Sequence, residues 1–259
     1  DKYFQIAPCF RDEDARADRS PGEFYQLDFE MSFATQEDVF RVGEEVLAAT
    51  FKKFAPEGYE VTEAPFPVFS YRQAMLEFGT DKPDLRNPLR IIDVTDFFQR
   101  CSFKPFHHKT VRAIKVHAEM SKGFHEKLLE YALSIGMGGL GYLEVQDDMA
   151  YKGPIDKYIP EDIKGELAQI AGLVPGDVIF FIADKEKLAC KYAGLIRNEL
   201  GKRLDICEKK AYRFCYVNDF PMYEIDEETG KIQFTHNPFS MPQGGLEALT
   251  TKDPLDILE

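Results

Sequence analysis

Two stretches near the start of the chain alternate between apolar and polar residues, and this alternation predicts a pair of β-strands. The first stretch is Tyr3–Phe10 and the second is Phe24–Phe33. In the second, the aromatic and aliphatic residues fall on one side, and Gln26, Asp28 and Glu30 fall on the other. A long charged segment joins the two stretches, so we expect an antiparallel pair with a functional rather than a minimal turn.

Helical patterns follow the predicted strand pair. Thr35 and Asp38 stand at capping-box spacing, and apolar residues continue at helical intervals to Phe54. Ser70 and Gln73 repeat the capping signal for a short helix that should end near Gly79. Two prolines then indicate irregular structure over 80–88.

The pattern changes again between about Ile91 and Leu204. Strand candidates alternate with helix candidates: strands at 111–116, 140–145 and 178–183, and helices at 121–135, 160–171 and 185–200. Pro160 fits just inside a helix start. The alternation predicts a self-contained α/β or α+β unit.

After Asp205 strands return, at 213–217, 222–225 and 231–235, with a turn over 227–230 between the last two. The simplest organisation is therefore an α+β protein in which one antiparallel-sheet domain, 1–90 and 205–259, is interrupted by an inserted α/β domain, 91–204.

Composition places the chain among globular proteins, since 44% of its residues are hydrophobic and 13% aromatic. No apolar run approaches the ~18 residues that span a bilayer, so we expect no membrane association. Five cysteines without a CxxC pair favour reduced thiols and a cytoplasmic location. The net charge of −13 argues against nucleic-acid binding by bulk electrostatics, so any RNA contact must be local.

The segment Arg11–Arg19 carries three arginines and four acids, which is ordinarily a solvated loop. Here Arg11 ends one predicted strand, beside the face that carries Gln26, Asp28 and Glu30. A guanidinium binds phosphate oxygens in a fork, one carboxylate can hold a divalent metal that bridges phosphates, and another can pair with an ammonium group. Such a surface would suit a nucleotide together with an amino acid.

The string Phe10–Phe33 resembles the second signature motif of class II aminoacyl-tRNA synthetases, in the version found in bacterial-type aspartyl-tRNA synthetases. Its core reads Phe-Arg-Asp-Glu-Asp, and its end reads Phe-Tyr-Gln-Leu-Asp-Phe-Glu-Met-Ser-Phe. The stretches 78–88, 219–222 and 236–239 resemble further segments of that family, and 91–204 stands where the family carries a domain shared with the B subunit of tRNA-dependent amidotransferases. The resemblance implies a partial class II catalytic domain built on an antiparallel β-sheet.

The resemblance also implies a role for each matched residue. Arg11 would contact the ATP α-phosphate and the carboxylate of L-aspartate, and Asp28, with Gln26 beside it, would receive the ammonium group. Glu30 would lie near the reacting phosphate through Mg²⁺. The remaining assignments are an ATP contact for Asp12 and for Ser20, the adenine end of ATP for Glu13, and the aspartate side chain for His236.

Ser20-Pro21-Gly22-Glu23 departs from the family, which has Gln-Pro-Glu here, so Ser20 is only the positional counterpart of a glutamine that contacts ATP. The family's first and third motifs and its anticodon-binding β-barrel have no counterpart in the chain. We therefore expect an internal segment of a longer, homodimeric enzyme, inactive by itself, whose tRNA contacts lie mainly elsewhere.

Two other classes of protein remain open at this level. One is a non-catalytic RNA-binding or amidotransferase-related module, which would lack the motif at 10–33. The other is a sister synthetase for asparagine or lysine, against which the Arg16–Arg19 string and the inserted domain both argue.

Overall fold

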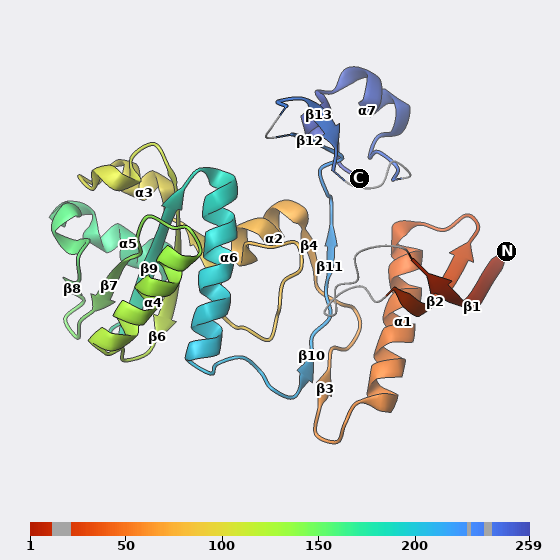
Figure 1. Ribbon diagram of the computed structural model, residues 1–259, viewed down its shortest axis with the longest axis horizontal. Coiled ribbons are helices and arrows are strands. Elements are labelled where there is room, and N and C mark those ends of the chain that lie inside the picture. Colours follow the sequence, from red (N-terminus) through yellow and green to blue (C-terminus); the bar gives the residue numbers. More distant parts are fainter. Residues whose placement is uncertain (12–21, 227–228, 236–239) are drawn as a thin grey trace. The chain divides into compact units, whose positions relative to one another are not determined.

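The computed structural model describes residues 1–11, 22–226, 229–235 and 240–259. The chain divides into two compact units, Asp1–Phe66 and Pro67–Glu259, which are described one at a time (Figure 1). The predicted boundaries at 90/91 and 204/205 do not coincide with this division and stay predictions.

The first unit contains an antiparallel strand pair, β1 (Lys2–Phe10) and β2 (Glu23–Met31), then helix α1 (Gln36–Phe54) and a short strand β3 (Glu60–Val61). The register places Phe4 opposite Phe29, and it confirms the predicted antiparallel pairing. Phe33 is excluded from β2 because it adopts a left-handed conformation, with φ 57°, in the turn that follows.

Helix α1 begins where its capping residues place it. The Thr35 hydroxyl accepts from the Asp38 backbone N–H at 3.3 Å, and the Asp38 carboxylate accepts from the Thr35 N–H at 3.1 Å. This exchange satisfies donors that have no partner inside the helix. The predicted capping box and the predicted end at Phe54 are both confirmed.

The second unit is centred on a five-stranded sheet in the order β5-β6-β9-β7-β8, and every neighbouring pair is antiparallel. Its strands are β5 (Ile91–Asp93), β6 (Thr110–His117), β7 (Gly141–Val145), β8 (Tyr151–Lys152) and β9 (Asp177–Asp184). The α/β description of 91–204 is therefore corrected, because the sheet has no parallel neighbours. Its helices cover an antiparallel sheet, which makes the unit α+β.

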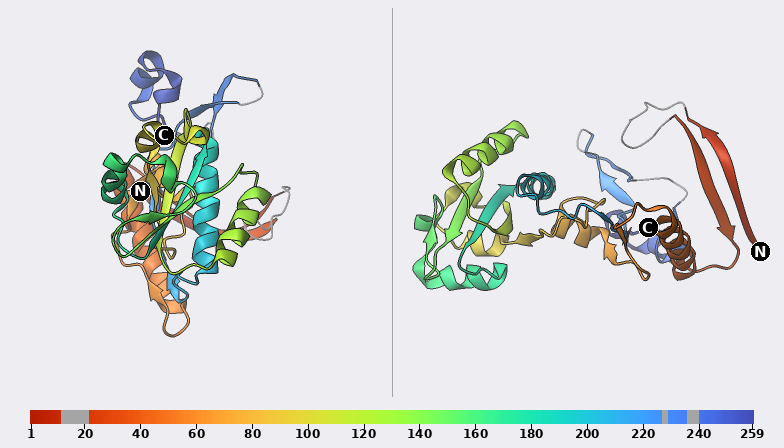
Figure 2. Two further views of the ribbon diagram at one scale, coloured as in Figure 1. Left: turned by 90° about the vertical axis from the view of Figure 1, so that its left-hand side faces the viewer. Right: turned by 90° about the horizontal axis from the view of Figure 1, so that it is seen from below.

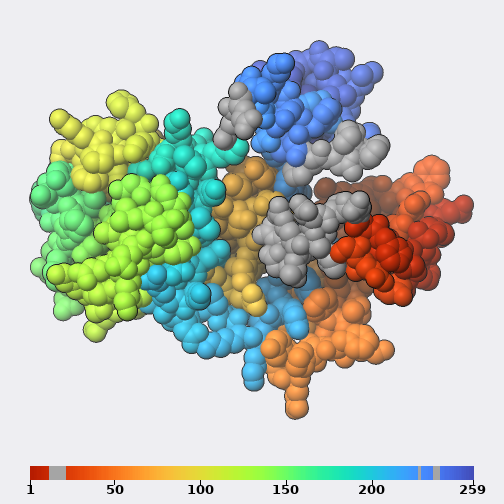
Figure 3. Space-filling view, in the orientation of Figure 1, coloured from red at the N-terminus to blue at the C-terminus, as the bar shows by residue number. Residues whose placement is uncertain are grey.

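Helices cover both faces of this sheet, as Figure 2 shows from the side. On one face α4 (Lys122–Ser134) and α6 (Glu186–Arg203) share a core with alternate residues of β9, including Phe180 and Ile182. On the other face α3 (Thr95–Gln99) and α5 (Lys164–Ala171) pack with Ile179 and Phe181. Figure 3 shows the side chains of α4 over the first of these faces. Burial on both sides explains why β9 is an unbroken apolar run rather than an alternating one.

Two of the element predictions in this unit were wrong in their bounds. Pro160 does not open an α-helix: it precedes a 3₁₀ turn, Glu161–Ile163, and α5 begins at Lys164. The strand expected over 213–217 is replaced by β10 (Ala211–Tyr212) and β11 (Tyr216–Asn218). The second of these pairs in parallel with β4 (Val68–Ser70), which sets its start at Tyr216.

Helix α2 (Tyr71–Phe78) packs against α6, and a pair of glycines makes the approach close. Gly79 ends α2 with φ 69°, as its capping position predicts. A Cβ on Gly79 would lie 2.4 Å from the carbonyl oxygen of Cys190 and 2.6 Å from the nitrogen of Gly194. The end of α2 thus packs directly against the backbone of α6.

The C-terminal part of this unit contains β12 (Tyr223–Ile225) and β13 (Ile232–Phe234), which form an antiparallel hairpin, and α7 (Gly245–Thr251). Both strands lie within the predicted ranges. Among the helices of the described ranges, none is long and apolar enough to cross a membrane.

Candidate functional site

The site predicted from the sequence lies on one face of the β1–β2 pair. Because opposite residues of an antiparallel pair share a face, the register brings side chains of both strands together here. We call this surface the polar face; it comprises Tyr3, Gln5, Cys9, Arg11, Gln26, Asp28 and Glu30. The four described residues of the predicted site are therefore on a single surface.

Hydrogen bonds connect the two strands across the polar face. The Gln5 amide donates to the Asp28 carboxylate at 3.3 Å, and the Tyr3 hydroxyl donates to the Gln5 side-chain oxygen at 2.9 Å. The Cys9 thiol lies 3.7 Å from the side-chain oxygen of Gln26. These contacts orient Asp28 and Gln26 without covering them.

Arg11 extends the strand pair by one residue. Its backbone N–H donates to the carbonyl oxygen of Gly22 at 2.8 Å, and its guanidinium carbon lies 5.4 Å from the centre of the Phe24 ring. Stacking on an aromatic ring restricts the position of the guanidinium. Arg11 therefore has a defined place at one end of the polar face.

The reverse face of the strand pair is apolar and is oriented toward α1. Phe4, Leu27 and Phe29 line a hollow of about 430 Å³ together with Val42 and Val46 of the helix. Since the apolar side faces α1, the pleat directs the acids and amides to the other side. The alternation of β2 thus decides which side chains can meet a ligand.

The polar face is much longer than any one of its side chains. Phe24, on which Arg11 stacks, and Glu30 are six residues apart, which is roughly 20 Å of extended strand. A small ion could not touch both ends of it. A guanidinium at one end and two carboxylates toward the other suit an extended ligand with an anionic part and a cationic part.

The carboxylates of Asp28 and Glu30 are candidate magnesium ligands. No group of three or more metal-binding side chains occurs within the described ranges. Mg²⁺ on a nucleotide typically uses one or two carboxylates and takes its other ligands from phosphate and water. Glu30 is exposed on the polar face, so the donor set fits a metal held jointly with phosphates.

The remaining predicted residues, Asp12, Glu13, Ser20 and His236, lie outside the described residues.

Gln5 and Cys9 are contacts that the sequence reasoning missed. Both alternate with the apolar residues of β1, as Gln26 and Asp28 do in β2. Pairing the strands in register would have brought these residues together, with Gln5 opposite Asp28. The sequence shows the alternation of polar and apolar residues in β1, but it does not show the register in which β1 pairs with β2.

Comparison with known proteins identifies the family of the chain. A family model for class II tRNA synthetases (D, K and N) matches residues 1–256. The chain therefore belongs to the class II tRNA synthetase family.

Within that family, the chain is similar to aspartate–tRNA ligases. It is 53% identical to the aspartate–tRNA(Asp/Asn) ligase of Gluconobacter oxydans over 99% of its length, and 54% identical to that of Zymomonas mobilis over its whole length. It is 52% identical to the aspartate–tRNA ligase of Streptomyces coelicolor, again over its whole length. The chain spans 44% of the length of each of these relatives.

Proposed function

We propose that this chain supplies part of the active site of an aspartate–tRNA ligase, which activates L-aspartate with ATP to aspartyl-adenylate and transfers it to the 3′ end of tRNA. The observation that carries the proposal is the register of β1 and β2, which sets Arg11, Gln26, Asp28 and Glu30 on one face. Identities of 50–54% to aspartate–tRNA ligases support aspartate over asparagine or lysine. The motif at 10–33 argues against a non-catalytic module.

Four residues of the polar face have a proposed role. Arg11 binds the α-phosphate of ATP and the aspartate carboxylate, and it neutralises charge as the carboxylate oxygen attacks phosphorus and pyrophosphate leaves. Asp28 pairs with the substrate ammonium group, with Gln26 beside it. Glu30 holds Mg²⁺, which supplies positive charge to the phosphates when bound.

Four further assignments rest on the family resemblance alone. Asp12 binds ATP, Glu13 binds its adenine end, Ser20 takes the place of the family's glutamine, and His236 favours the aspartate side chain.

The resemblance also supports a domain arrangement and partners. The segments 1–90 and 205–259 belong to the catalytic domain, and 91–204 is the inserted domain of the type found in the amidotransferase B subunit. The whole protein is a cytoplasmic homodimer that binds tRNA mainly through other parts. The relatives bear both aspartate-tRNA and aspartate/asparagine-tRNA names at similar identity, so either tRNA preference suits the proposal.

Aspartate-dependent exchange of pyrophosphate into ATP, measured on the full-length protein that carries this segment, tests the proposal. Removing one donor that stabilises a transition state typically costs about 10²–10³-fold in rate, and we expect Arg11→Lys and Asp28→Asn to lose at least about 100-fold. Glu23→Gln is the matched control: this exposed acid lies on the same strand but on the opposite face, and it should retain activity. Exchange that proceeds with asparagine or lysine but not aspartate would refute the assignment, as would an unaffected Arg11→Lys variant.

A further inference from the structure

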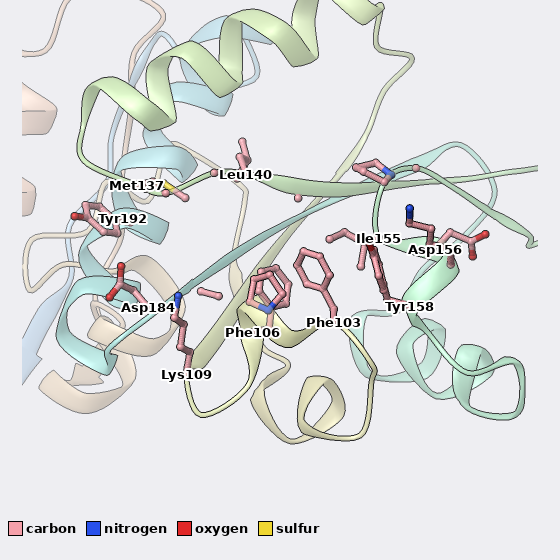
Figure 4. A pocket seen from close by; sticks show the side chains of 18 residues that line it. Phe103, Phe106, Lys109, Met137, Leu140, Ile155, Asp156, Tyr158, Asp184 and Tyr192 are labelled. Carbon is pink, nitrogen blue, oxygen red and sulfur yellow. The ribbon is translucent and has the colours of Figure 1, made fainter.

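A hollow of about 840 Å³ lies beside the five-stranded sheet of the second unit, and none of the residues that line it belongs to the polar face. It is formed where the loop before β7, the turn after β8 and the segment 103–109 meet (Figure 4). Its volume is within the range of small-molecule sites in proteins, about 300–1,000 Å³. Nothing in the proposed aspartate chemistry uses it.

One end of this pocket is aromatic. Tyr158 and Phe103 are half-buried, with ring centres 4.8 Å apart, and Phe103 packs edge-on to Phe106 at 4.7 Å. Phe106 is buried and is itself anchored against Phe98 at 5.0 Å. The rings therefore form a fixed wall against which a flat ligand could stack.

The pocket also has two cationic side chains without acidic partners. Within the described part of the chain, neither Lys109 nor Lys157 has an ion pair. Of the two acids at the pocket, Asp156 is paired with Lys164 at 2.9 Å, and Asp184 accepts from the Lys185 backbone N–H at 2.7 Å. Lys157 lies over the Tyr158 ring at 5.0 Å, so Lys109 is the ammonium group that can meet an anion at this pocket, in a chain of net charge −13.

Backbone donors are exposed at the same pocket. The N–H groups of Gly138, Gly139 and Leu140 form no hydrogen bond to any described residue. A Cβ on Gly138 or Gly139 would meet nothing within 4 Å, so the chain here is open to an approaching ligand. Successive free N–H groups are good ligands for phosphate oxygens.

Lys109 and Asp184 lie at the same end of the pocket, away from Tyr158 (Figure 4). The sheet register agrees, because Thr110, the residue after Lys109, is opposite Asp184. A carboxylate beside an ammonium group can accept from a sugar hydroxyl while the ammonium group binds phosphate. The pocket thus offers partners for a ring, a hydroxyl and an anion.

We propose that this pocket binds a nucleotide: the base stacks on Tyr158 beside the tilted ring of Phe103, the ribose hydroxyls donate to Asp184, and the phosphate is bound by Lys109 and the amides of 138–140. The nucleotide is either a free mononucleotide or an unpaired nucleotide of an RNA strand, since both present this chemistry. The site is separate from the ATP site proposed on the polar face, and either can be absent without the other.

A tryptophan reporter tests the proposal directly, because the chain contains no tryptophan. Tyr158→Trp keeps an aromatic ring in the wall and places the only indole in the pocket, where a stacked base quenches its fluorescence. The 259-residue chain with this substitution is titrated with AMP, CMP, GMP and UMP to about 10 mM, well above the Kd expected for one stacking and one ionic contact. Leu133→Trp, at an exposed position of α4, controls for absorption and collisional quenching.

Saturable quenching of the pocket reporter, absent from the Leu133→Trp control, is the expected result. Adding Lys109→Gln should weaken binding about fivefold, whereas Lys127→Gln, at an exposed lysine on α4, should change it less than about twofold. If only a short single-stranded oligoribonucleotide quenches, with the same dependence on Lys109, the ligand is an RNA nucleotide. The proposal is overturned if neither probe quenches, or if Lys109→Gln binds as well as Lys127→Gln.

Discussion

Arg197 is a fully buried arginine on α6, and it makes the stability of the second unit testable. Its Nε donates to the carbonyl oxygen of Leu89 at 2.7 Å, and one Nη donates to the carbonyl oxygens of Asn87 at 2.7 Å and Asp84 at 3.0 Å. Burial, followed by repulsion from Arg90, lowers the pKa of Arg197 to about 10, so the guanidinium stays charged at neutral pH. It therefore holds the irregular segment 84–89 onto the helix as a cation.

Arg197→Met removes these donors but keeps an unbranched side chain. Two of the three hydrogen bonds are buried, and a buried acceptor left without a partner costs about 1–3 kcal/mol. Part of this loss is offset because the other Nη has no acceptor among the described residues and the guanidinium is no longer desolvated. We expect a net loss of about 3 kcal/mol in the free energy of unfolding, or roughly 6–12 °C in Tm for a unit of this size.

Arg90→Met is the matched control. Arg90 also lies over the Phe78 ring, at 4.6 Å compared with 5.1 Å for Arg197, but its side chain is 41% exposed and its ion pair with Glu77 is long, at 3.7 Å. Losing it should cost less than about 1 kcal/mol. Urea unfolding followed by far-ultraviolet circular dichroism measures both variants. The reasoning fails if Arg197→Met is no more destabilising than Arg90→Met.

Three further measurements address other parts of the chain. Hydrogen bonds from Thr35 lower the pKa of Asp38, so its contribution to α1 is present above the ordinary value of 3.8 and is lost as pH falls through the lower folded value. The protection of the α1 amides, corrected for the intrinsic pH dependence of exchange, should fall there in the wild type and stay constant in Asp38→Asn. Thr35→Ala should destabilise the helix by about 1 kcal/mol at neutral pH in the same assay, and an unchanged exchange rate would contradict the capping role. Burial raises the pKa of Cys101 to about 11, so at pH 8 iodoacetamide should leave it unmodified by mass spectrometry until urea unfolds the sheet; rapid native labelling would show that the thiol is accessible. Amides of β1 and β2, a two-stranded pair with no buried side chain, should exchange far faster than those of β9, where Asp177–Ile182 are all buried, and equal protection would overturn that ranking.

Local signals in the sequence predicted the elements well. Thr35 and Asp38 identify the start of α1, and Ser70 and Gly79 identify both ends of α2, because these residues act on backbone groups a few positions away. The apolar runs of β6 and β9 were also recognisable, since each is long enough to exclude a loop. Prediction failed where distant pairing decides: β11 starts at Tyr216 because β4 lies beside it, and nothing near Tyr216 in the sequence says so.

The candidate site also has one part that the local sequence predicts and another part that depends on the pairing of distant segments. Period-two alternation places Gln26, Asp28 and Glu30 on one face, and that part follows from the strand alone. The contribution of Gln5 depends on its register with Asp28, which is a property of the pair of strands. The pocket at Tyr158 could not have been predicted, because Lys109, Gly138 and Tyr158 come from three separate connections around the sheet.

Arg197 shows why a charged residue in an amphipathic helix is hard to interpret from sequence. From the helical sequence pattern, Arg197 would be assigned to the solvent-exposed side of α6, since arginine is rarely buried without partners. Its burial is possible only because 84–89 has no regular structure and so turns the carbonyl oxygens of Asp84, Asn87 and Leu89 toward one point. Asn87 completes the arrangement by donating to the Arg197 carbonyl oxygen at 2.9 Å. The irregular segment and the buried charge therefore depend on each other, and neither would be stable in this conformation if the other were replaced.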